Sequence, residues 1–188
     1  GDARLAGGAA RAGPRGAKLA GRDVDDAPHP SAYGFDESLV SFEGLGDRIL
    51  FGTTGLNGAS VKLGQGNITQ VEKRDMTRIY ADHAIDFLDR VGDEPFYLEL
   101  FPNDVHDRFL PTPEDAAKFA PITDNPEEQR FLAVLTKMDR QIGRVLDHLD
   151  ATELGDNTIV IFTSDNGATD WPRYYKADIE PPGSSGPF

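Results

Sequence analysis

Apolar residues recur with helical spacing in two stretches of the chain. The first begins near Val71 and ends near Gly92, and its apolar residues return every three or four positions, which predicts an amphipathic helix of about four turns. The second stretch covers about residues 127–149 and has the same periodicity. The repeating positions are Met76, Ile79, Tyr80, Phe87 and Leu88 in the first stretch and Phe131, Met138, Ile142, Val145 and Leu149 in the second.

Two short apolar runs without helical spacing predict β-strands. Residues 95–101 follow the first helix, and residues 158–163 follow the second. The run from Thr158 to Phe162 lacks polar alternation and is rich in β-branched residues, which is typical of a strand buried on both faces. A short helix is also expected over residues 113–119. Helix, strand, helix, strand is the order of the α/β class, so we expect a mostly parallel β-sheet flanked by helices.

The chain before Val71 has a different character. Residues 1–22 are mostly Gly and Ala with scattered basic residues, and we expect this low-complexity segment to be poorly ordered. From Asp23 to about Gln70 the sequence is rich in Pro, Gly and Asp and predicts long surface connections rather than core. The domain is therefore expected to cover residues 23–188.

Composition and charge narrow the possible partners. The chain has 188 residues, of which 38% are hydrophobic, so it can form one domain with a sizeable core. Its net charge of −13 argues against nucleic acid and anionic membranes as partners. It contains no cysteine, which excludes disulfides, thiolate metal sites and a cysteine nucleophile within it. The chain starts at Gly1, and we expect it to be a piece of a longer protein or a processed product.

Polar residues follow each predicted strand directly. If the two strands are parallel, their carboxyl ends lie at one edge of the sheet, where open α/β sheets place their ligands. His106 follows the strand at 95–101, and Asp165 and Asn166 follow the strand at 158–163. The order therefore predicts that His106 and Asp165 are neighbours in space.

These residues suggest an anion and cation site. Asp165 and Asn166 each offer an oxygen to a hard cation, and Gly167 lets the backbone turn sharply; alternatively, Asn166-Gly167 is the turn of a hairpin. His106 could donate a hydrogen bond to a substrate oxyanion, transfer a proton or contact metal. The neighbouring Asp104 and Asp107 could tune its pKa or simply make the loop soluble, and we favour the second.

Several segments, taken in order, resemble one family. They are Tyr33-Gly34-Phe35-Asp36-Glu37, Ala84-Ile85-Asp86-Phe87-Leu88, Pro95-Phe96-Tyr97-Leu98 leading to Val105-His106, residues 142–149, residues 156–167 and residues 181–188. Together they resemble the sulfatase family of the alkaline-phosphatase superfamily over roughly residues 23–188. The resemblance implies an incomplete fold of that superfamily, and an arylsulfatase-like hydrolase of small-molecule or carbohydrate sulfate esters that is often secreted or periplasmic.

The resemblance also implies particular roles for the candidate residues. Carried over by position, Asp165 and Asn166 are two ligands of a divalent cation, usually Ca²⁺ with Mg²⁺ as the other choice, and His106 binds the sulfate group. The family's nucleophile is a formylglycine made from Cys or Ser in a Cys/Ser-x-Pro/Ala-x-Arg motif. No residue of this chain stands in that motif, and the family's early aspartate pair and Lys-x-His pair are also missing.

We therefore expect a partial catalytic domain that has no turnover as these 188 residues alone. Two alternatives remain open. One is a phosphatase or phosphodiesterase of the same superfamily, although the Asp-Asn-Gly sequence favours the sulfatase. The other is a non-catalytic remnant or binding module built on the same sheet.

Overall fold

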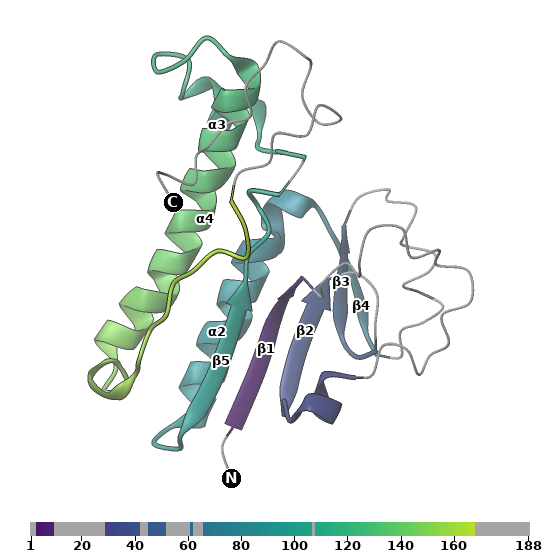
Figure 1. The fold of residues 1–188 in the computed structure, drawn as a ribbon, viewed down its shortest axis with the longest axis vertical. Helices are drawn as coiled ribbons and strands as arrows, with labels where there is room; N and C mark the ends of the chain where they lie inside the picture. The colour runs from purple at the N-terminus through teal and green to yellow at the C-terminus, as the bar shows by residue number, and fades with distance from the viewer. Residues whose placement is uncertain are drawn as a thin grey trace.

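The sheet is parallel and lies against one long helix, which packs in turn on a second. The computed structural model describes residues 3–9, 29–41, 45–51, 61, 66–106 and 108–167. Within these residues the strands pair in the order β4-β3-β2-β1-β5, and every pair is parallel. Figure 1 shows the strands side by side, with β5 at one edge and β4 at the other. The strands are β1 (Ala3–Ala9), β2 (Glu37–Ser41), β3 (Arg48–Phe51), β4 (Ile68–Val71) and β5 (Phe96–Phe101).

Helix α2 (Met76–Val91) carries most of the core. It follows a 3-10 turn, η3 (Lys73–Asp75), and ends at Gly92, whose φ of 58° lies in the left-handed region that glycine tolerates best. Its apolar face packs on β1 and β5, and its outer side packs on α4. Ala81, Ala84, Phe87, Leu88 and Val91 form one buried cluster with Val145 and Leu149 of α4, and Phe96, Leu98 and Leu100 of β5 pack against it.

Helix α4 (Pro126–Ala151) begins where three local signals coincide. The Asn125 side chain accepts hydrogen bonds from the backbone N–H groups of Glu127 and Glu128, at 2.9 Å and 3.4 Å. Pro126 occupies the first turn, where its missing N–H costs nothing, and the two glutamates suit the positive end of the helix dipole. The short helix α3 (Pro113–Ala117) precedes it and is capped by Thr112. Both helices confirm the sequence-based prediction.

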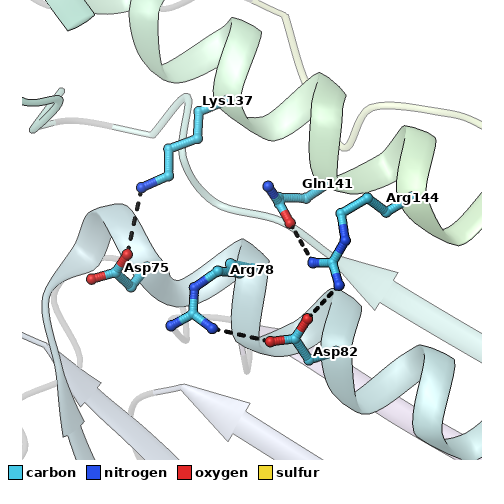
Figure 2. Close-up of polar contacts among 6 residues, drawn as sticks. All are labelled: Asp75, Arg78, Asp82, Lys137, Gln141 and Arg144. Carbon is cyan, nitrogen blue, oxygen red and sulfur yellow. Dashed lines mark hydrogen bonds and ion pairs between the residues drawn. The ribbon is translucent and has the colours of Figure 1, made fainter.

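Charged side chains link α2 and α4 along their solvent side. Figure 2 shows two contacts between the helices: Lys137 with Asp75 at 3.5 Å, and Arg144 with Asp82 at 2.7 Å. Arg78 and Gln141 complete the group, with Arg78 bonding Asp82 and Gln141 bonding Arg144. These side chains are partly exposed, so each ion pair adds only about 0–1 kcal/mol. The apolar contacts below them therefore hold the two helices together.

The N-terminal part of the chain differs from its sequence-based expectation. Residues 3–9, expected to be poorly ordered, form the strand between β2 and β5, and residues 10–28 lie outside the described residues. From Asp23 to about Gln70, where surface connections were expected, the chain forms β2, β3 and most of β4, which are three of the five strands described, and Ile49 is fully buried. A strand flanked on both sides is stabilised by its backbone ladders, which the amino-acid pattern of a short strand does not reveal.

The predicted strand at 158–163 is not formed. The segment is irregular, and Ile159, Ile161 and Phe162 are 89%, 82% and 79% exposed. The prediction is wrong here because β-branched residues favour a strand only when a neighbouring strand accepts the backbone hydrogen bonds. In the described part of the chain, none of the helices is both long and apolar enough to cross a bilayer.

Candidate functional site

The candidate site lies at the carboxyl edge of the sheet. All strands are parallel, so their carboxyl ends share one edge, and α2 begins at that edge because it follows β4. Figure 1 shows the arrowheads of β1, β2 and β5 and the start of α2 at the same end of the sheet. The chain that leaves β5 there carries His106. We call its described residues, 102–106 and 108, the His106 loop.

His106 is exposed at the surface of this loop. Its backbone N–H donates to the carbonyl oxygen of Asn103 at 3.1 Å, which closes a turn directly after β5. An exposed imidazole on a turned backbone can donate a hydrogen bond to an anion or exchange a proton with a bound molecule. The structure therefore places His106 where the sequence predicts, just past the carboxyl end of a parallel strand.

Lys73 attaches the His106 loop to the start of α2. Its side chain is 6% exposed, and its ammonium group donates to the carbonyl oxygens of His106 and Arg108, the latter at 3.0 Å. Burying an ammonium group is costly unless it is hydrogen-bonded, and here two backbone carbonyls supply that compensation. The sequence-based reasoning missed Lys73, which lies 33 residues from its partner His106.

Asp104 is also buried and bonded to α2. It is 4% exposed, and one of its carboxylate oxygens accepts a hydrogen bond from the Thr77 hydroxyl. Burial raises the pKa of Asp104, while the Thr77 hydrogen bond and the positive charge of Lys73 act in the opposite direction. The expectation that Asp104 merely makes the loop soluble is therefore wrong, and Asp107 lies outside the described residues.

The helical spacing in the sequence contains a signal that could have identified Lys73 and Thr77. Lys73, Thr77 and Tyr80 are spaced by four and three positions, so they share one face of η3 and α2. All three are buried, and burial raises the pKa of Tyr80 to about 12. A lysine and a threonine on the buried face of a helix indicate a polar partner in the fold, although the pattern does not say which segment supplies it.

Asp165 and Asn166 lie in the irregular segment after α4, and both are exposed. The Ser164 hydroxyl donates to the Asn166 carbonyl at 2.6 Å, and the Asn166 side-chain amide donates to the carbonyl of Gly167 at 2.9 Å. Within the described ranges, no group of three or more His, Asp or Glu side chains could hold a metal ion. The oxygens of Asp165 and Asn166 are of the type that calcium prefers, but two donors do not complete its coordination shell of six to eight. The closeness of His106 and Asp165 stays a prediction.

The comparisons with known proteins decide the family. The model of the Sulfatase family matches residues 26–183, which is most of the chain. The chain belongs to the sulfatase family. This confirms the resemblance carried by the segments between residues 23 and 188.

Named sulfatases are among its relatives. An N-acetylgalactosamine-6-O-sulfatase of Bacteroides thetaiotaomicron is 37% identical over 93 residues, which are 50% of this chain and 17% of that protein. The human N-acetylgalactosamine-6-sulfatase is 32% identical over 130 residues, 69% of this chain and 21% of that protein. The chain thus spans about a fifth of the length of these sulfatases.

A solved structure supports the fold. The crystal structure of Ps i-CgsB in complex with k-i-k-neocarrahexaose matches with a TM-score of 0.56 and 20% identity. The match covers 83% of this chain and 35% of that chain. The parallel sheet with flanking helices is therefore the sulfatase-type α/β fold, as the sequence predicts, and the chain represents about a third of that neighbour.

Proposed function

We propose that the intact sulfatase containing this chain hydrolyses a sulfate ester, and that its substrate is a carbohydrate sulfate. Membership of the family supports the reaction class. The names of two relatives, both N-acetylgalactosamine 6-sulfatases, and the neocarrahexaose bound to Ps i-CgsB support a sugar as the carrier of the sulfate group. Partners of other kinds, such as nucleic acid, are disfavoured by the net charge of −13.

The observation that carries this proposal is the placement of His106. It is exposed directly after β5, at the sheet edge where parallel α/β folds bind their ligands, on a backbone attached to α2. We assign it the role of hydrogen-bond donor to a sulfate oxygen. A donor held in place before the substrate arrives stabilises charge that develops on that oxygen during the reaction.

Asp165 and Asn166 are proposed as two ligands of a divalent cation, Ca²⁺ or Mg²⁺. Their oxygens are of the type that these cations prefer, but they do not make a complete site by themselves. The formylglycine nucleophile of the family has no precursor in this sequence, which lacks cysteine and the serine form of the motif. We therefore assign no catalytic step to a metal or a nucleophile in this chain.

One alternative is a binding module that holds a sulfated sugar without cleaving it. A phosphate-ester hydrolase of the same superfamily is the other alternative. Both differ from the main proposal in what the protein does to a sulfate ester, so one assay series separates them.

The test is hydrolysis of a chromogenic aryl sulfate and of 6-sulfated N-acetylgalactosamine by the intact protein. We expect turnover that a chelator removes, and a fall of about 10²-fold in kcat/KM for His106→Ala, the size typical of losing one charge-stabilising donor. The 188-residue chain alone should give no turnover. Binding of the sulfated sugar without hydrolysis would support the binding module, and cleavage of an aryl phosphate in preference to the sulfate would support the phosphatase.

A further inference from the structure

We propose that Lys73 and Thr77 are positioning residues for His106, and that they act by fixing the backbone of the His106 loop. This inference rests on the proposed function, because it takes His106 as the residue that contacts the sulfate group. We call Lys73, Thr77 and Asp104 the loop anchor.

The loop anchor holds alternate residues of the loop. Thr77 bonds the side chain of Asp104, and Lys73 bonds the carbonyls of His106 and Arg108. Both donors come from one side of the continuous stretch formed by η3 and α2, since they lie four positions apart along it. The loop is thus attached before, at and after His106.

The loop anchor is buried, whereas the residue that it holds is exposed. Lys73, Thr77 and Asp104 are 6%, 1% and 4% exposed, whereas His106 is exposed. A buried hydrogen bond that involves a charged group is stronger than an exposed one, and losing one partner leaves the other without compensation. The backbone of His106 is therefore held by buried groups, while the residue itself is exposed at the surface where an anion would arrive.

Such an arrangement matters for catalysis as well as for stability. A hydrogen-bond donor is effective only where the charge of the transition state will be, and a displacement of about 1 Å can lower a rate about 10²-fold. Release of the loop should displace His106 and therefore lower the rate of sulfate-ester hydrolysis, even when the fold persists.

Hydrogen exchange in the intact protein tests the anchoring itself. In Lys73→Met and Thr77→Val, we expect amide exchange in residues 103–106 and 108 to be at least about tenfold faster, with α4 unchanged. Thr77→Ser keeps the hydroxyl and should restore the wild-type rate. Lys118→Met is the matched control, because that lysine is exposed and pairs with Asp115, three positions away in the same segment, at 2.6 Å. Unchanged exchange in the loop, or an equal rise in α4, would overturn the proposal.

A double-mutant cycle tests whether the anchor acts through His106. Lys73→Met should lower kcat/KM for an aryl sulfate by about 10- to 100-fold in the wild-type background and hardly at all in His106→Ala. A full loss in both backgrounds would mean that Lys73 acts independently of His106 and would overturn the positioning role. If the intact protein hydrolyses no sulfate ester, the proposed function fails, and the exchange experiment still decides the anchoring.

Discussion

At the scale of single residues, the unusual feature of this molecule is the burial of charged groups near the carboxyl edge of the sheet. Asp104 and Lys73 are almost fully buried, and each is bonded to a group from a distant part of the sequence. At the opposite, amino edge of the sheet, Arg48 begins β3; it is 0% exposed and donates to the Gly46 carbonyl at 2.8 Å, while burial lowers its pKa. Burying a charged side chain costs free energy unless it is hydrogen-bonded, so replacing one of these residues tests the contact that it makes.

Asp104 makes stability depend on pH in a defined direction. Its pKa in the folded state is raised by burial, so the folded protein binds the proton more tightly than the unfolded chain. The stabilisation is fully present below the unfolded pKa, about 3.9, and is lost as the pH rises through the folded pKa. Asp104→Asn removes this dependence, because a neutral amide replaces the acid.

The free energy of unfolding of Asp104→Asn, relative to the wild type, should therefore increase as the pH rises from about 3.9, and should level off once the folded pKa is passed. Urea unfolding at a series of pH values between about 3.5 and 7.5 measures it. Asp124→Asn, at an exposed aspartate, controls for the loss of one negative charge. A difference that falls with pH would show that the pKa of Asp104 is lowered instead.

At the scale of elements, the packing of α2 between the sheet and α4 determines the stability of the described fold. The cluster joins both long helices and the apolar side of β5, and Phe87 and Phe96 meet edge to face at 6.2 Å between ring centroids. The ion pairs between α2 and α4 lie at the surface of this contact and add little. Stability should therefore respond to the apolar residues.

Two leucines, one in each long helix, test whether stability depends on the buried apolar residues. Leu88 on α2 is 2% exposed and belongs to the cluster, so Leu88→Ala should lower the free energy of unfolding by about 2–5 kcal/mol. Leu146 on α4 is 38% exposed, and Leu146→Ala should cost less than about 1 kcal/mol. Urea unfolding of both variants gives the comparison. Equal losses would show that Leu146 is covered in solution.

At the scale of the whole molecule, the chain leaves apolar surface exposed next to its sheet. Residues 159–162 are mostly exposed, and so are Tyr97 and Phe101 on the side of β5 that faces away from the core cluster. Parallel sheets are ordinarily buried on both faces. The chain spans about a third of the Ps i-CgsB structure, which agrees with a domain whose sheet is only partly covered in the described residues.

The exposure of residues 159–162 can be tested with two isoleucine substitutions in the 188-residue chain. Ile161 is 82% exposed, so Ile161→Ser should change the free energy of unfolding by no more than about 0.5 kcal/mol and should lower the binding of a hydrophobic dye. Ile49 is fully buried in β3, so Ile49→Ser should lower the free energy of unfolding by several times as much as Ile161→Ser changes it. A large loss from Ile161→Ser would mean that residues 158–163 are packed after all.

The sequence by itself determined the features that depend on local periodicity and on short motifs. Helices α2 and α4 follow from apolar residues spaced by three and four, and the start of α4 follows from Asn125 and Pro126. The strand β5 follows from a compact apolar run, and the family follows from segments quoted in order along the chain. His106 was identified because it comes directly after that strand.

Tertiary structure alone decided what depends on partners distant in the sequence. It placed the Gly- and Ala-rich residues 3–9 between two strands and left the apolar residues 158–163 without one, because strand formation depends on backbone pairing with another segment. It also revealed that Lys73 and Thr77 hold the His106 loop across 33 and 27 residues of sequence. A hydrogen bond between two such distant groups leaves no periodic signal, because it forms only when the fold brings them together.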